Sequence, residues 1–110
     1  EQNINLLFID SPLGTGYNFA PNSSYIYNDQ TTADDTLNAL IYFFNSKFPS
    51  YKDKKVFLAG EGYAGKYIPD LVLRISAFNS LADFKINLNG ILVGNGIMDF
   101  SEGSLEKSQV

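Results

Sequence analysis

The sequence predicts an α/β fold with parallel strands, in the order strand, helix, strand, helix, strand. Three short apolar runs each stop at turn-forming residues. Between them lie two longer stretches in which apolar residues recur every three or four positions, as on an amphipathic helix. The connections are long enough for right-handed crossovers. The strand ends at Asp10, Gly60 and Asn95 should therefore share one edge of the sheet, where open α/β folds bind ligands.

The first predicted strand, residues 4–9, is apolar except at Asn5, which is typical of a strand covered on both faces. Asp10, Ser11 and Pro12 end it, since these residue types favour turns.

The first predicted helix begins at Thr31 or Thr32, either of which supplies a capping hydroxyl. Asp34 and Asp35 then fall in the first turn, where they interact favourably with the helix dipole. We interpret these carboxylates as cap and surface charge rather than as a metal pair. Pro49 closes the helix.

The central strand, residues 56–59, leads through a sharp turn at Gly60 into a second helix. Because proline lacks an N–H group and suits the first helical position, we expect one short turn after Gly60 and a regular helix from about Pro69 to Asn79. Residues 86–93 form the third predicted strand.

The turn at residues 60–66 is the strongest candidate site, because three glycines within six residues allow positive φ and close backbone approach. Three chemical interpretations are open. Gly60, Gly62 and Gly65 spell G-x-G-x-x-G, which can hold a dinucleotide pyrophosphate at a helix N-terminus. That interpretation needs an acidic residue at the tip of the next strand, where Asn95 stands instead.

The same residues spell G-x-x-x-x-G-K, the phosphate loop of nucleoside triphosphatases, but Tyr67 stands where the magnesium-binding hydroxyl should follow Lys66. The third interpretation is the nucleophile elbow, G-x-S-x-G or its variant ending in alanine. Gly60 and Ala64 supply its small neighbours, and Gly62 occupies the place of the serine.

Residues 60–65, Gly-Glu-Gly-Tyr-Ala-Gly, followed by Tyr67 and Pro69, resemble the signature G-E-S-Y-A-G of the serine carboxypeptidases, with one position changed. The resemblance covers nearly the whole chain in the family's order. Further matches are residues 6–19 with L-F-L-D-S-P-x-G-x-G-F-S, Asp29, Thr32, Ala33 and Asp35 with D-x-x-T-A-x-D, the aromatic stretch 43–52, and Gly94, Asn95 and Asp99 with G-N-x-x-x-D.

The resemblance implies that residues 1–110 are the central fragment of one α/β-hydrolase domain. It places Gly62 at the nucleophile position and makes the Tyr63 N–H an oxyanion donor. It also implies that Glu61 and Gly60 bind the substrate, with Glu61 at the C-terminal carboxylate of a peptide. Two carboxyl groups share a proton only when one is protonated, which predicts recognition at acidic pH.

The expected activity of the family is serine-type release of C-terminal amino acids from peptides. Glycine cannot attack a carbonyl, and the chain contains no histidine to act as base, so we expect this chain to be inactive. One alternative is a non-catalytic protein that binds peptide C-termini through Glu61. The other alternative is a nucleotide-binding βαβ domain.

The composition of the chain excludes several classes of binding partner. The net charge of −4 and the lack of a basic cluster argue against binding of nucleic acid. No apolar run has the length of a transmembrane helix, so no membrane partner is predicted. The chain has no cysteine, and we predict neither a cofactor nor a metal.

Asn22 begins an N-glycosylation sequon, Asn-Ser-Ser, in a polar stretch. Together with the resemblance it predicts a protein of the secretory pathway, whether vacuolar, lysosomal or extracellular. The chain starts at Glu1 directly before a strand, which we interpret as the start of an internal fragment.

Overall fold

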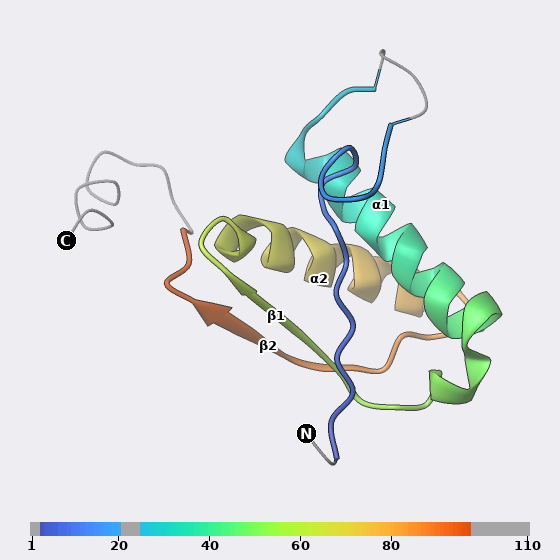
Figure 1. Cartoon of the computed structure of the whole chain (residues 1–110). Helices are drawn as coiled ribbons and strands as arrows, with labels where there is room; N and C mark the ends of the chain where they lie inside the picture. Colours follow the sequence, from blue (N-terminus) through green and yellow to red (C-terminus); the bar gives the residue numbers. More distant parts are fainter. Residues whose placement is uncertain (1–2, 21–24, 98–110) are drawn as a thin grey trace.

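The computed structural model describes residues 3–20 and 25–97 and confirms the α/β fold. Strands β1 and β2 pair in parallel, and helix α2 is the crossover between them (Figure 1). The helices and strands, in chain order, are α1 (Asp29–Ile41), β1 (Val56–Glu61), α2 (Ala64–Leu81) and β2 (Leu88–Gly94).

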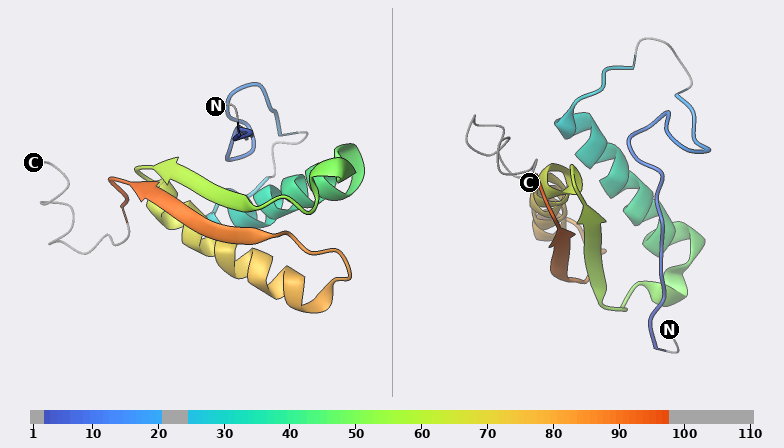
Figure 2. Two further views of the ribbon diagram at one scale, coloured as in Figure 1. Left: turned by 90° about the horizontal axis from the view of Figure 1, so that it is seen from below. Right: turned by 60° about the vertical axis from the view of Figure 1, so that its left-hand side comes forward.

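Helix α2 lies along one face of this two-stranded sheet (Figure 2). The side chains of Leu58 and Val56 on this face are partly buried and pack against the hydrophobic core. The opposite face is open, because Phe57 and Leu92 are 57% and 59% exposed. Alternate residues of β1 therefore face α2 and solvent, as the two-residue period of a strand requires.

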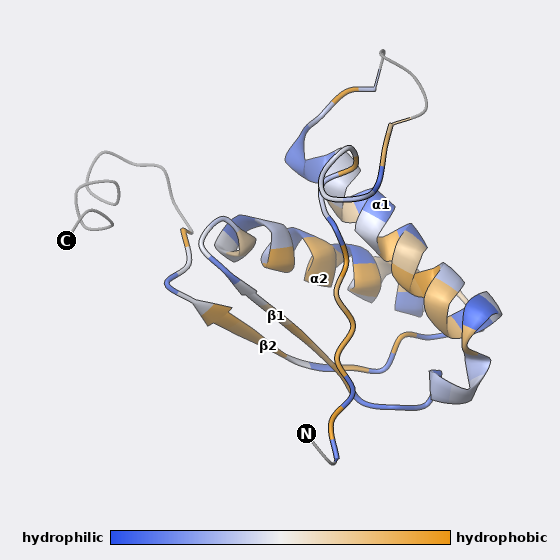
Figure 3. Ribbon diagram, in the orientation of Figure 1, coloured by the Kyte–Doolittle hydropathy of each residue, from blue (hydrophilic) through white to orange (hydrophobic). Residues whose placement is uncertain are grey.

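The predicted strand at residues 4–9 is wrong. The segment is extended but forms no ladder with either strand, and it runs apart from β1 (Figure 2). The segment is largely hydrophobic (Figure 3), yet its apolar side chains remain uncovered. Leu6 is 78% and Phe8 86% exposed. Hydrophobic composition identified a segment that fits a buried strand, but among the described residues no strand lies beside it to pair with. The observed core is thus β-α-β rather than β-α-β-α-β.

Helix α1 begins at Asp29, two or three residues earlier than predicted, because Asn28 caps it. The Asn28 side chain accepts a hydrogen bond from the Thr31 N–H (2.8 Å), and the Thr31 hydroxyl accepts one from the Asn28 N–H (3.2 Å). This reciprocal capping box places Asp29 in the first turn instead of Asp34 and Asp35. Thr31 therefore belongs to the capping box as its N3 residue, and Asn28 is the N-cap.

Asp34 and Asp35 each connect α1 to another segment of the chain. Asp34 forms an ion pair with Arg74 of α2 (2.8 Å), and Asp35 accepts a hydrogen bond from the Tyr25 hydroxyl. After Ile41 the helix continues as a π-helical turn, Tyr42–Lys47, and Pro49 opens a short 3-10 turn. The prediction that Pro49 ends the helix is confirmed to within two residues.

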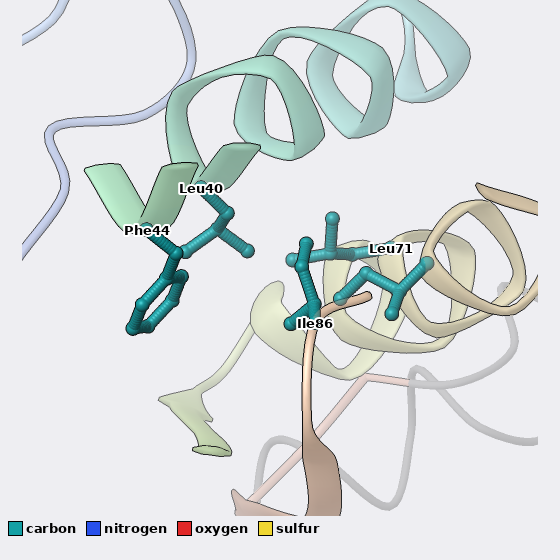
Figure 4. Close-up of a cluster of buried hydrophobic side chains, with 5 residues drawn as sticks. Leu40, Phe44, Leu71 and Ile86 are labelled. Carbon is teal, nitrogen blue, oxygen red and sulfur yellow. The ribbon is translucent and has the colours of Figure 1, made fainter. Parts of the chain in front are cut away.

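The core lies between α1, α2 and the chain entering β2. Ile75 is 1% and Ile86 2% exposed, and both belong to one buried cluster, in which Leu40 of α1 points toward Ile86 (Figure 4). The buried cluster consists of Leu40, Phe44, Leu71, Ile75 and Ile86.

Helix α2 starts at Ala64, directly after the turn, so the prediction of a start near Pro69 is wrong. The N–H groups of Gly65 and Lys66 already bond the carbonyls of Gly62 and Tyr63 (3.0 and 2.9 Å). Pro69 lies inside the helix, where its lack of an N–H removes a single bond of an 18-residue element.

Strand β2 begins at Leu88, two residues after the predicted start. Ile86 precedes it and is held by Asn79, the side chain of which donates to the Ile86 carbonyl (2.8 Å) and accepts from the Ile86 N–H (2.9 Å). Asn79 therefore satisfies two backbone groups in the connection between α2 and β2.

Candidate functional site

The turn between β1 and α2, the predicted elbow, has a residue of left-handed backbone conformation at its centre. Gly62 adopts φ +63°, the left-handed conformation that glycine accepts most readily. Its N–H donates to the Gly94 carbonyl (3.2 Å), and its carbonyl accepts from the Ile97 N–H (2.9 Å). A Cβ built on Gly62 would have no heavy atom within 4 Å. A side chain at this position would therefore enter open space at the end of the strands.

The neighbouring small residues allow the strand and helix to meet closely. A Cβ on Gly60 would collide with the Ala64 methyl group, and a Cβ on Gly65 would lie 2.7 Å from the Ile97 carbonyl oxygen. Small residues at 60, 64 and 65 are thus required by packing, whatever chemistry the turn performs.

The end of β1 brings Glu61 next to Gly94 of β2, which confirms that these two strand ends share an edge. Asp10 lies outside the sheet; its carboxylate instead accepts a hydrogen bond from the Tyr17 N–H (2.9 Å). Glu61 is exposed, and within the described residues its carboxylate has no hydrogen bond or ion pair. It is available to a ligand at this edge.

Tyr63 follows Gly62 and occupies the N-cap position of α2. Its hydroxyl donates to Asp29 Oδ1 of α1 (3.2 Å), and its ring packs edge-on against Tyr67, with ring centroids 4.6 Å apart. Partial burial, together with the negative charge and the hydrogen bond of Asp29, raises the pKa of Tyr63 above its ordinary value. The elbow is thereby tied to the N-terminus of α1.

Comparison with known proteins identifies the family. The model of the serine carboxypeptidase family matches residues 1–109. The chain belongs to the serine carboxypeptidase family. Its relatives include the human probable serine carboxypeptidase CPVL (42% identity over 87% of this chain and 20% of that protein) and the mouse lysosomal protective protein (41% identity over 89% and 19%). The Arabidopsis thaliana serine carboxypeptidase-like 41 is 45% identical over 86% of this chain and 20% of its own length.

The fold agrees with this family. The crystal structure of KEX1(DELTA)P, a prohormone-processing carboxypeptidase from Saccharomyces cerevisiae, superposes with a TM-score of 0.75 and 26% identity, over 94% of this chain and 25% of that one. The chain spans about a fifth of the length of the curated relatives it matches.

Membership of the serine carboxypeptidases removes support from both nucleotide interpretations of the turn. Lys66, the lysine of the G-x-x-x-x-G-K pattern, forms an ion pair with Asp70 one helical turn later (3.7 Å). Asn95 follows β2, where a dinucleotide site needs an acid. In the part of the chain that the structure describes, no group of three or more metal-ligating side chains occurs and no helix could cross a bilayer.

The sequence interpretation named Gly60, Glu61, Gly62 and Tyr63, and the structure brings all four together at one turn. Asn22 and Asp99 lie outside the described residues. The sequence interpretation did not include two sets of contacts: the hydrogen bond from Tyr63 to Asp29, and the hydrogen bonds between Gly62 and residues 94–97. The turn at residues 94–97 could have been expected, because an asparagine between two glycines favours a turn with positive φ.

Replacing Asp29 with asparagine should lower the pKa of Tyr63, since the negative charge that disfavours the phenolate is removed. Difference titration of tyrosinate absorbance against a Tyr63→Phe variant measures this pKa. The matched control is Asp35→Asn, which should instead lower the pKa of Tyr25. An unchanged Tyr63 pKa in Asp29→Asn would contradict the hydrogen bond between Tyr63 and Asp29.

The same contact gives a stability dependence with a definite sign. Since the pKa of Tyr63 is raised in the folded state, its contribution to folding is complete below the ordinary value of 10.0 and is lost as the pH rises through the folded pKa. Unfolding midpoints of the parent chain should therefore fall more steeply in this alkaline range than those of Asp29→Asn.

Proposed function

We propose that this serine carboxypeptidase-like chain carries an elbow that cannot attack a peptide bond, because glycine occupies the nucleophile position. The single observation that supports this is the left-handed φ of Gly62 at the strand-to-helix turn, with open space where a side chain would project. A nucleophilic serine in this fold needs this backbone and this free approach. Glycine supplies the geometry without the hydroxyl.

The elbow still has a backbone group that could stabilise an oxyanion, but the chain has no histidine that could act as the base. The N–H of Tyr63, directly after the elbow residue, is the proposed oxyanion donor. Gly60 is proposed to contribute to substrate binding, and its lack of a side chain leaves room for the Ala64 methyl group. A histidine is needed to take the proton of a serine, and none of the 110 residues is histidine. Hydrolysis would require both a hydroxyl at residue 62 and a base from a longer polypeptide.

We further propose that residues 1–110 form the central part of one α/β-hydrolase domain. The match to a fifth of each relative and the TM-score of 0.75 support this. The kinship with the lysosomal protective protein and the sequon at Asn22 support a place in the secretory pathway, with Asn22 as a glycosylation site.

Restoring the hydroxyl tests the proposal. In a complete polypeptide that contains these residues, Gly62→Ser should raise hydrolysis of a blocked dipeptide at mildly acidic pH by several orders of magnitude over the parent. Gly62→Ala is the matched control, because it carries the same backbone strain without a hydroxyl. Hydrolysis by the unaltered protein would contradict the proposal.

A second candidate function is non-catalytic binding of peptide C-termini, which the free Glu61 carboxylate at the sheet edge favours. A hydrogen bond from residue 61 to the terminal carboxylate needs a donor on the side chain, which glutamine supplies, so Glu61→Gln should retain binding. Glu61→Ala should weaken binding by about tenfold.

Isothermal titration with a peptide bearing a free C-terminus measures these affinities. The same peptide with an amidated C-terminus is the control ligand, since it lacks the carboxylate. Equal affinity for the two peptides would exclude Glu61 as the recognising group.

A further inference from the structure

The turn after β2, residues 94–97, is bonded to both backbone groups of Gly62. Gly94 provides the carbonyl that accepts from the Gly62 N–H (3.2 Å), and Ile97 provides the N–H that donates to the Gly62 carbonyl (2.9 Å). These two bonds come from positions three residues apart, so both form only when the intervening chain folds back on itself.

Asn95 is the residue at which this fold-back occurs. It has φ +48° and is the one described non-glycine residue with positive φ. Asparagine tolerates this conformation better than other side chains, whereas a β-branched residue is strongly disfavoured in it. Asn95 is exposed and makes no side-chain hydrogen bond within residues 3–20 and 25–97. Its side chain therefore has no visible packing role, and its backbone conformation is its distinguishing feature.

Gly65 of α2 lies against the other side of the turn at residues 94–97. A Cβ at Gly65 would lie 2.7 Å from the Ile97 carbonyl oxygen and 2.8 Å from the Ile97 nitrogen, so the turn is pressed directly onto the first turn of α2. Helix α2, the elbow and the turn at 94–97 are thus in mutual backbone contact.

We propose that Asn95 is a positioning residue for the elbow: its left-handed backbone sets the turn at 94–97, which holds residue 62 in the conformation of a nucleophile whatever side chain stands there. The inference deepens the proposed function, on which it rests for the assignment of the elbow. It explains how the elbow geometry persists with glycine at its centre.

A reporter thiol at residue 62 tests this without any turnover. The chain contains no cysteine, so Gly62→Cys introduces a single one at the N-terminus of α2. The helix amides should hold the pKa of this thiol below the ordinary value of about 8.5. Ser76→Cys, exposed in the middle of α2, is the reference thiol. The pH dependence of alkylation by a neutral reagent measures both pKa values.

Asn95→Gly should leave the depressed thiol pKa unchanged, because glycine accepts φ +48°. Asn95→Val should move that pKa to the value of the reference thiol, since the turn can no longer hold residue 62. In the cysteine-free chain, Asn95→Val should also speed hydrogen exchange of the Ile97 N–H by at least about tenfold, while Asn95→Gly should not. Asn79→Ala, which removes two bonds far along α2, is the control for a general loss of stability.

Three results would overturn the inference: an unchanged thiol pKa in Asn95→Val, an equal shift in Asn95→Gly, or the same shift in Asn79→Ala. If Asn95→Val fails to fold, exchange of the Ile97 N–H in Asn95→Ala replaces it, with intermediate acceleration expected. These readouts are independent of Gly62→Ser hydrolysis. A failure of the positioning role is therefore distinguishable from a failure of the proposed function.

Discussion

Gly65→Ala should destabilise the chain by about 3 kcal/mol, because its new methyl group meets backbone atoms that cannot rotate away. The nearest are the oxygen and nitrogen of Ile97, at 2.7 and 2.8 Å. Overpacking of this kind costs about 2 kcal/mol, and displacement of Ile97 would also break its hydrogen bond to Gly62, which is worth about 1 kcal/mol. Urea unfolding followed by circular dichroism measures the difference.

Gly94→Ala is the matched control for this prediction. A Cβ at Gly94 would have no heavy atom within 4 Å, and its φ is not positive. Its free energy of unfolding should stay within about 1 kcal/mol of the parent, with any change on the stabilising side. Equal destabilisation by the two alanines would mean that glycine is needed at this edge for a reason other than contact with Ile97.

Ile75→Ala should destabilise the chain by about 2 to 5 kcal/mol, because it removes the most buried side chain of a small core. Ile75 is 1% exposed and packs with Leu40 and Ile86, which come from different parts of the chain. The resulting cavity would lie where α1, α2 and the entry to β2 meet, so little of the surrounding structure can close it.

Leu73→Ala serves as the control in the same helix, since Leu73 is 69% exposed. It should change the free energy of unfolding by less than about 0.5 kcal/mol. Both variants are compared by urea unfolding. If Ile75→Ala and Leu73→Ala lowered the free energy of unfolding equally, the packing of α2 against α1 would not be the source of its stability.

The turn that carries the candidate site could be predicted from sequence, because the signals for it are local. The glycines at 60, 62 and 65 fall within six residues, and the strand before them and the helix after them are short-range patterns. The structure places Gly62 at φ +63° in this turn. The predicted start of α2 was wrong. A proline inside a helix removes one hydrogen bond and crowds the carbonyl one turn earlier, but a long helix with a buried face tolerates that cost.

The predicted start of α1 was wrong for a local reason: asparagine is a better N-cap than threonine, and Asn28 and Thr31 bond reciprocally. Predictions that depended on distant partners also failed. The segment at 4–9 has the composition of a strand, but pairing needs a neighbour that composition does not reveal. The bond between Tyr63 and Asp29 joins residues 34 positions apart, and no local pattern indicates it.

We expect the uncovered segment at residues 4–9 to promote association between copies of the chain. It presents a window of β-prone apolar residues without a charge or a proline, the composition that favours intermolecular cross-β stacking. Copies of the isolated chain should therefore aggregate through this window as their concentration rises. A lysine in place of Leu6 or Phe8 would act as a gatekeeper and keep the chain dispersed.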